Sequence, residues 1–152
     1  MAALAQEVKA QEVLPASAFT VVVTRQPVSL GGDTMDHTRV IALDDRTAHP
    51  TLGSLVSAVQ HGGHWVSAGA STTWVLREDD ARNWHGRPLA VFVLDRQRRA
   101  VDVHPVGDLS FRVAKGGRFH LEYLLSQSVE RTLELIAADP RGKHSLREDR
   151  QA

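Results

Sequence analysis

TLGSLVSAVQHGG, residues 51–63, carries the clearest helical pattern in the chain. Its large apolar residues recur at intervals of three and four, which places them on one face of an α-helix. Thr51 is a residue type that caps a helix N-terminus, and the Gly62-Gly63 pair is a common C-terminal stop. The stretch predicts an amphipathic helix that packs on another layer, and its apolar face consists of Leu52, Leu55, Val56 and Val59.

Two apolar runs downstream of this helix predict strands. They are TWVLR, residues 73–77, and PLAVFVL, residues 88–94, and both are rich in the β-branched and aromatic residues that strands favour. Because residues 88–94 are the most apolar run, we expect them at the centre of the sheet. Short strands are also expected at residues 64–66 and, after a charged turn, at residues 101–104.

Upstream of the helix, residues 18–25 and 37–43 predict an antiparallel pair of strands. The first, AFTVVVTR, is rich in β-branched residues, and the second, HTRVIAL, alternates apolar and polar side chains. The loop between them, residues 26–36, contains a turn-forming Gly31-Gly32 pair. Residues 1–17 are expected to form a short or frayed helix that leads into the fold.

The C-terminal part predicts a strand followed by a helix. Residues 119–125 alternate in a way that favours a strand, although a helix also fits this pattern. Beyond them, apolar residues recur at helical spacing until Asp139-Pro140 ends the helix. Residues 140–152 contain only one large apolar residue, Leu146, so we expect a disordered tail that can be removed without loss of stability.

Together these elements predict a single α+β domain over residues 18–139. We expect a mostly antiparallel sheet of five or six strands, with the helix of residues 51–63 packed across one face and a second helix at the C-terminal end. A length of 152 residues, of which 42% are hydrophobic, suits one domain with a sizeable core.

The composition makes several function classes unfavourable. The 18 Lys and Arg balance the 18 Asp and Glu, so no net charge attracts nucleic acid or an anionic membrane. Without cysteine there is no disulfide framework and no thiolate nucleophile. No apolar run is long enough to form a transmembrane helix, and we expect a cytoplasmic protein.

Eight histidines are the main compositional oddity. His61 and His64 lie near the end of the predicted helix, where two imidazoles can face one ion, but a metal site needs three or four ligands. The other histidines are dispersed without a ligand motif, and the serines and glycines match no nucleophile or phosphate-binding motif. We therefore expect no metal, no cofactor and no catalytic residue.

The polar segment of residues 78–87, EDDARNWHGR, contains a tryptophan that no apolar neighbour in the sequence explains. Either the segment folds back and buries the indole of Trp84, or Trp84 is an exposed anchor ringed by charges, as in interface hot spots. The candidate partner-binding residues are Asp79, Asp80, Arg82, Trp84 and His85, together with Asp33 and Asp36 of the earlier loop.

Residues 51–95 resemble small uncharacterised actinobacterial proteins, some of which are similar to immunity partners of polymorphic toxins. The matching features are the helix of residues 51–63, Trp74-Val75 in one strand, and residues 88–91 at the start of the next strand. The resemblance covers about a third of the chain. It implies a protein partner and transfers no active-site residue, and the polar segment of residues 78–87 departs from the pattern.

We therefore expect a non-enzymatic protein-binding module of the immunity or antitoxin kind, which blocks a partner by occupying its site. Charged loops around a rigid sheet suit fast, charge-complementary docking. Two other classes stay open. One is a small-molecule-binding protein or small hydrolytic enzyme that uses His and Asp from the loops, and the other is a structural subunit of a homodimer.

The dispersed histidines generate a prediction about metal content. Purified, untagged protein should carry no stoichiometric transition metal, because no cysteine supports the scattered imidazoles. Elemental analysis of the protein checks this. One zinc, nickel or iron per chain would contradict the prediction and favour the enzyme hypothesis.

Overall fold

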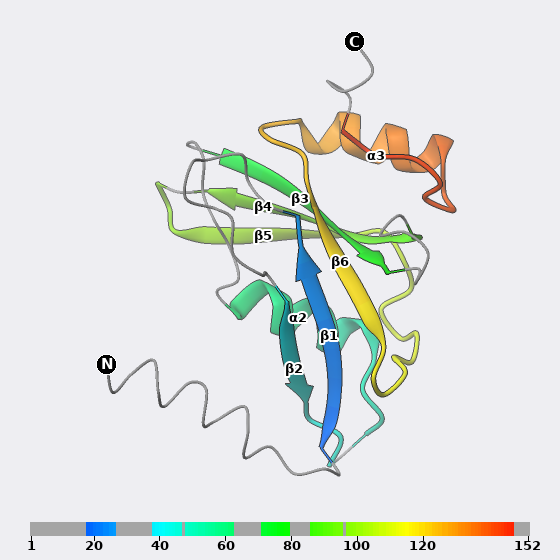
Figure 1. Cartoon of the computed structure of the whole chain (residues 1–152). Coiled ribbons are helices and arrows are strands. Elements are labelled where there is room, and N and C mark those ends of the chain that lie inside the picture. Colours follow the sequence, from blue (N-terminus) through cyan, green and yellow to red (C-terminus); the bar gives the residue numbers. More distant parts are fainter. Residues whose placement is uncertain are drawn as a thin grey trace.

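The computed structural model describes residues 18–26, 38–46, 48–62, 71–79, 86–95 and 97–147. Within these ranges the chain forms one six-stranded sheet and two helices, as Figure 1 shows. The α+β class predicted from the sequence is confirmed. In chain order the elements are β1 (Phe19–Arg25), β2 (Arg39–Leu43), α2 (Leu52–His61), β3 (Ser71–Glu78), β4 (Pro88–Asp95), β5 (Ala100–Pro105), β6 (Arg118–Tyr123) and α3 (Val129–Ala138).

The sheet has the strand order β2-β1-β6-β3-β4-β5. Every neighbouring pair is antiparallel except β1 and β6, which run parallel, so the prediction of a mostly antiparallel sheet is confirmed. The expected pairing of β1 with β2 is present, with Val21 opposite Ile41. β6 confirms a strand for the segment before α3. The strand expected over residues 64–66 lies outside the described residues.

The prediction that the most apolar strand lies at the centre of the sheet is wrong. β4 lies between β3 and the edge strand β5, whereas β6 and β3 occupy the middle. β4 is apolar because both of its faces are covered. Phe92 belongs to the core cluster that contains α2, and Val91 belongs to the cluster that contains α3. Apolar content therefore follows the coverage of the two faces and not the position in the strand order.

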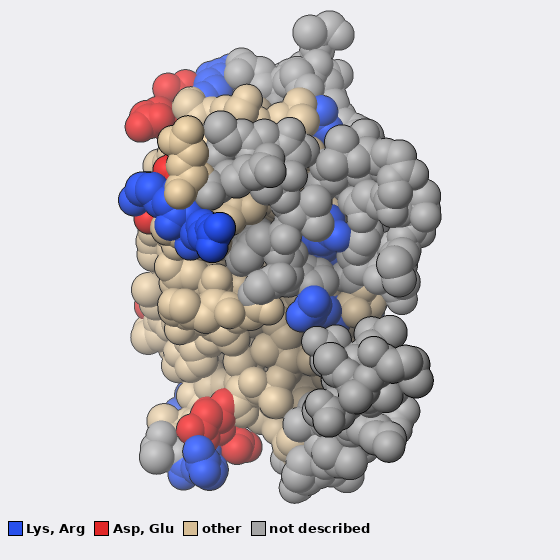
Figure 2. Space-filling view, turned by 90° about the vertical axis from the view of Figure 1, so that its left-hand side faces the viewer, with Lys and Arg blue, Asp and Glu red and all other residues tan. Residues whose placement is uncertain are grey.

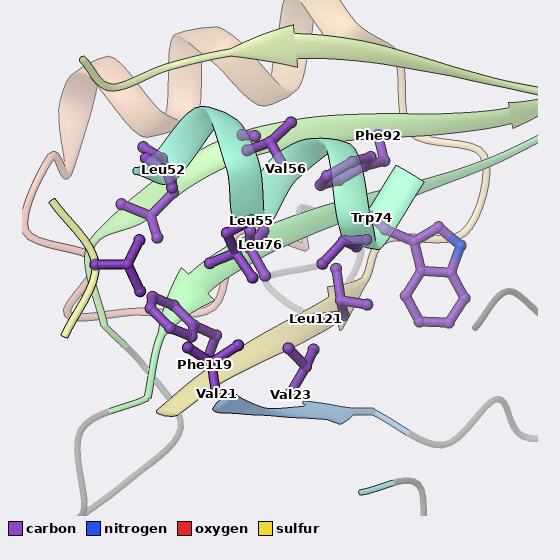
Figure 3. Close-up of a cluster of buried hydrophobic side chains, with 14 of the residues drawn as sticks. Val21, Val23, Leu52, Leu55, Val56, Trp74, Leu76, Phe92, Phe119 and Leu121 are labelled. Carbon is purple, nitrogen blue, oxygen red and sulfur yellow. The ribbon is translucent and has the colours of Figure 1, made fainter. Parts of the chain in front are cut away.

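α2 covers one face of the sheet and begins where the sequence predicts. The Thr51 hydroxyl accepts a hydrogen bond from the backbone N–H of Ser54, and the Ser54 hydroxyl accepts one from the backbone N–H of Thr51, which forms a capping box. The four predicted apolar residues of α2 are buried, and Figure 3 shows three of them, Leu52, Leu55 and Val56, in the same cluster as Val21, Leu76 and Leu121 of the sheet. Burying each such side chain stabilises the fold by roughly 1.5–3 kcal/mol.

α3 packs against the opposite face of the sheet. Consecutive residues of β3 show this, because Trp74 belongs to the cluster under α2 whereas Val75 belongs to the cluster that includes Ile136 of α3. The helix begins after Ser128, whose hydroxyl accepts a hydrogen bond from the backbone N–H of Arg131. The sheet therefore has a separate apolar cluster on each face, and Figure 1 shows the two helices apart from each other.

The expectation of a disordered tail over residues 140–152 is wrong for residues 141–147. Leu146 is only 2% exposed and packs in the cluster with Val75, Val91 and Ile136. Polar groups of the sheet bind the backbone of this segment, and a count of apolar residues does not reveal such contacts. Residues 148–152 lie outside the described residues.

The docked segment generates a stability prediction. Leu146→Ala should lower the free energy of unfolding by about 2–5 kcal/mol, because it leaves a cavity in a packed cluster. Truncation after Pro140 should lower the melting temperature by more than about 5 °C. Denaturant and thermal unfolding measure both effects. Leu133→Ala, at a position of α3 that is 38% exposed, is the control and should stay within about 0.5 kcal/mol. An unchanged melting temperature for the truncated chain would contradict the docked arrangement.

Candidate functional site

Most of the predicted partner-binding residues lie outside the described part of the chain. These are Asp33, Asp36, Asp80, Arg82, Trp84 and His85. Asp79 is described, and its carboxylate lies 3.6 Å from Nε of Arg118 with only 14% of the side chain exposed. Its backbone N–H donates to the carbonyl oxygen of Arg118. Asp79 is therefore held against the start of β6, and the predicted set stays untested as a surface.

The described histidines are dispersed, and several of them hold local structure. Nε2 of His49 lies 2.9 Å from the carbonyl oxygen of Val113, and Nδ1 of His61 lies 2.9 Å from that of Ser57. His120 is buried, with Nδ1 2.7 Å from the hydroxyl of Thr24. Among the described residues, no group of three or more His, Asp or Glu side chains is placed to hold a metal ion. His64, the proposed companion of His61, is outside these residues.

A surface that the sequence did not single out lies on the loop after β5. Its large apolar side chains are exposed, and Phe111 is the most exposed of them at 44%. The guanidinium of Arg87 lies 5.1 Å from the centre of the Phe111 ring, a cation–π geometry. We call this set the 106–111 surface, and it consists of Val106, Leu109 and Phe111 with Arg87.

The backbone of this loop is held by the neighbouring elements. At the start of α2, the N–H of Leu52 donates to the carbonyl oxygen of Phe111 at 2.7 Å, and the N–H of Gly53 donates to that of Leu109 at 2.9 Å. The N–H of Val106 donates to the carbonyl oxygen of Leu89 in β4 at 3.0 Å. The loop thus satisfies two otherwise orphaned donors of the helix N-terminus, and its apolar side chains project from a fixed backbone.

A pocket of about 240 Å³ lies beside the 106–111 surface. This volume is below the roughly 300–1,000 Å³ of typical small-molecule sites, so the pocket suits a single inserted side chain better than a whole ligand. Its lining is mainly apolar and joins four parts of the fold: α2, β4, the loop after β5 and the end of α3. The lining residues include Leu52 of α2, Leu89 of β4, Val106, Phe111, Ile136 of α3 and Pro140.

Two charged side chains accompany this apolar lining, Arg87 and Asp108. Arg87 also donates a hydrogen bond to the carboxylate of Glu78 at 2.8 Å. The side chain of Ser110 donates to the carboxylate of Asp108 at 2.7 Å, and this hydrogen bond, with a second one from the Ser110 backbone, lowers the pKa of Asp108. The pocket therefore has one cation and one ionised acid next to an apolar floor.

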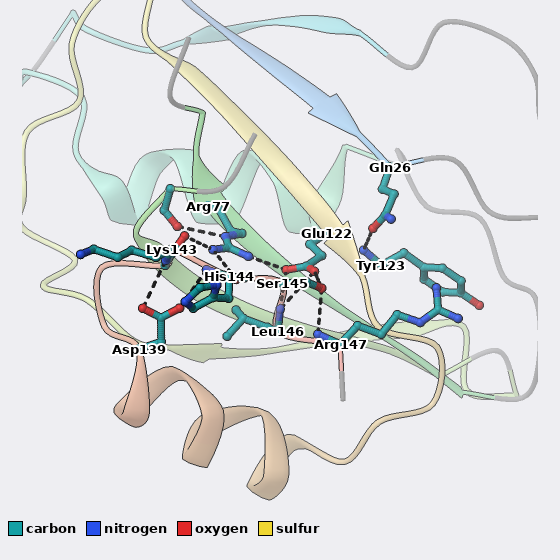
Figure 4. Close-up of polar contacts among 12 residues, drawn as sticks. Gln26, Arg77, Glu122, Tyr123, Asp139, Lys143, His144, Ser145, Leu146 and Arg147 are labelled. Atoms are coloured by element: carbon teal, nitrogen blue, oxygen red, sulfur yellow. Dashed lines mark hydrogen bonds and ion pairs between the residues drawn. The ribbon is translucent and has the colours of Figure 1, made fainter. Parts of the chain in front are cut away.

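The most buried charges in the described structure are Arg77 of β3 and Glu122 of β6, shown in Figure 4. Nη1 of Arg77 donates to Oε1 of Glu122 at 2.6 Å, and both side chains are fully enclosed. Arg77 also donates through Nη2 to the carbonyl oxygen of Gly142 at 2.6 Å. Glu122 accepts hydrogen bonds from the backbone N–H of Leu146 and from the Ser145 hydroxyl.

This ion pair has the geometry of a structural clamp. Besides the carbonyl oxygen of Gly86, which accepts from Nε of Arg77, its hydrogen-bond partners are backbone groups of residues 142–146 and the Ser145 hydroxyl, so the pair holds that segment on the sheet. Gly142 has φ +69°, and a Cβ at this position would collide with the carbonyl oxygen of Gly86 and with Nη2 of Arg77. Because both charges are enclosed and paired, Glu122 is positioned to hold the segment and not to meet a substrate.

Asp139 supports the same segment from the end of α3. Its carboxylate accepts hydrogen bonds from the backbone N–H groups of Lys143 and His144, at 3.2 and 3.0 Å. Burial raises the pKa of the Asp139 carboxyl, but these hydrogen bonds and the nearby His144 and Arg77 together outweigh burial, and the pKa lies below its ordinary value. The stability that Asp139 contributes is therefore present at neutral pH and is lost as the pH falls through the pKa of the folded state.

Comparisons with known proteins give no relative from which a function can be transferred. No protein-family model, no curated protein and no solved structure matches the chain. None of the helices within the described ranges is long and apolar enough to cross a membrane.

The sequence contained a weak signal for the 106–111 surface. In PVGDLSFR, residues 105–112, three large apolar residues stand among turn-forming Gly, Asp and Ser, and the same reasoning singled out Trp84. Their exposure was not readable, because it depends on how α2 and β4 bind the loop backbone.

The clamp generates the next prediction. Glu122→Gln should lower the free energy of unfolding by about 3–5 kcal/mol, because it leaves the buried Arg77 charge uncompensated. Chemical denaturation measures the loss. The matched control is Glu134→Gln, which removes an exposed partner of Arg131 and should change stability by less than about 1 kcal/mol. Equal effects of the two substitutions would contradict the role given to the buried pair.

Proposed function

We propose that this protein is a non-enzymatic protein-binding module that docks a partner through the 106–111 surface. The observation that carries the proposal is an exposed aromatic side chain on a fixed loop, stacked with Arg87 beside an apolar pocket. Aromatic residues and Arg are the side chains most enriched at interface hot spots. A loop already ordered by hydrogen bonds loses little conformational entropy on binding.

The two ends of the predicted polar segment, residues 78–87, lie at the same location. The N–H of Glu78 donates to the carbonyl oxygen of Arg87 at 3.0 Å, and Arg87 is itself part of the 106–111 surface. We therefore include the predicted binding residues of this segment in the proposed interface.

The proposed mode of action is inhibition by occupation, as the resemblance to immunity proteins implies. A partner inserts one apolar side chain into the pocket and presents polar groups to Arg87 and Asp108. The proposed place of action is the cytoplasm, which agrees with a chain that contains no cysteine.

Site-specific photo-crosslinking tests this function. A photoreactive amino acid at position 111 should crosslink one predominant protein in the native host, and the same residue at the exposed position 133 should not. Phe111→Ala should weaken binding of the purified partner by about 2 kcal/mol or more, as truncated hot spots do. It should change stability by less than about 1 kcal/mol, because the ring is already 44% exposed.

Two outcomes contradict the proposal. One is equal crosslinking from positions 111 and 133. The other is a Phe111→Ala variant that binds the partner as tightly as the Leu133→Ala control does. A small molecule that protects the protein from unfolding and depends on Phe111 would favour the small-molecule alternative.

A further inference from the structure

β2 is an edge strand whose outer backbone groups are directed away from the sheet. The register of β1 with β6 directs the N–H and C=O groups of even-numbered β1 residues toward β6, as the bond from Val22 to Gly117 shows. Odd-numbered β1 residues such as Val21 therefore bond to β2, where Ile41 lies opposite. It follows that Val40 and Ala42 present their backbone groups at the outer edge.

This edge is open in the described structure. Within the described ranges, the outward N–H and C=O groups of Val40 and Ala42 carry no hydrogen bond. The Val40 side chain is 46% exposed and Ala42 is also exposed. An open edge with apolar side chains is a template for pairing with another strand.

The opposite edge of the sheet is protected by contrast. The side-chain amide of Gln60 in α2 donates to the outward carbonyl oxygen of Val101 in β5 at 2.7 Å. β5 also carries the charged Asp102 and ends at Pro105, which has no N–H to offer. The two edges therefore differ: β2 carries the charged Arg39 but has no proline and, among the described residues, no side chain that bonds its outward backbone groups.

The charges flanking β2 are self-complementary in an antiparallel arrangement. Arg39 stands at the start of the strand, and Asp45 follows its end, next to Asp44, whose carboxylate is paired with Arg46. Figure 2 shows that much of the described surface of the face it views is uncharged, with acidic groups mainly near its upper and lower ends and basic groups at mid-height as well. A second copy of β2 running in the opposite direction brings each Arg39 toward Asp45 of the other strand.

We propose that β2 pairs with β2 of a second copy around a two-fold axis at Ile41. In this register Val40 of one copy lies opposite Ala42 of the other, and each such pair exchanges N–H···O bonds in both directions. The two Ile41 side chains meet on the α2 face, and Val40 packs beside Ala42 on the opposite face. Arg39 is diagonal to Asp45 of the second copy, within reach of a long side chain.

The pairing is self-complementary, as a two-fold interface requires, and joins the two sheets into one continuous sheet. Because a single short strand buries little surface, the dimer is concentration-dependent and not obligate. Figure 1 shows β2 and the loop after β5 on different sides of the molecule, so the dimer leaves the 106–111 surface accessible.

Sedimentation-velocity ultracentrifugation over a range of concentrations tests the dimer with the full chain. Wild type should shift from monomer to dimer as the concentration rises. Ala42→Pro removes an outward N–H that β1 does not use, so the fold should persist while the dissociation constant rises at least about tenfold. Val103→Pro, which removes the corresponding outward N–H on β5, is the matched control and should leave dimerisation unchanged.

A charge-reversal series keeps the test independent of proline tolerance. Arg39→Glu and Asp45→Arg should each weaken the dimer, and the double variant should restore it, because the charges only exchange places. A wild type that stays monomeric at all concentrations overturns the proposal. So does a dimer that Ala42→Pro and both charge reversals leave intact. Crosslinking from position 111 reports on the partner surface separately, so the two proposals can fail independently.

Discussion

The buried pair of Arg77 and Glu122 is the constraint on which the α3 side of the structure depends. Two charges in the middle of a sheet lose their hydration, and Coulomb attraction offsets this loss only when the remaining donors and acceptors are also satisfied. The chain satisfies them with backbone groups of residues 142–146, the Ser145 hydroxyl and the carbonyl oxygen of Gly86. The C-terminal segment must therefore close over β3 and β6 for the folded state to be stable, and Leu146 then fills the apolar cluster beneath α3.

The pocket of the candidate docking surface depends on this ion pair, because the pair fixes the segment that follows α3. The pocket beside Phe111 is lined in part by Ile136 and Pro140, at the end of α3. The next residues are bound by Asp139 and by the Arg77–Glu122 pair, so the end of α3 is fixed from both sides. The opposite wall comes from the loop after β5, which the N-terminus of α2 holds. The pocket is thus assembled from parts that are far apart in the sequence.

This assembly explains which features the sequence predicted. Local signals were sufficient for α2, because the spacing of Leu52 and Val59 and the Thr51 cap act within one helix. They were insufficient for residues 141–147, because Glu122 and Arg77, both distant in the chain, bind the backbone of this segment and so place Leu146 in the apolar cluster. The same limit applies to Phe111, whose exposure depends on hydrogen bonds from α2. Periodicity predicts which side of a helix or strand is apolar. It does not predict which side chain accepts a hydrogen bond from a backbone N–H that is distant in the sequence.

Dimerisation through β2 would raise the apparent affinity of the 106–111 surface for a dimeric partner. Strand pairing through β2 joins two copies at one side of each molecule, whereas the 106–111 surface lies on another side. The proposed dimer therefore presents two docking surfaces in a fixed relation. For a partner that is itself dimeric, the second contact becomes intramolecular, and the apparent affinity rises without any new contact. A weak strand-to-strand contact is then sufficient, because the bound partner stabilises the pairing that brought the two surfaces together.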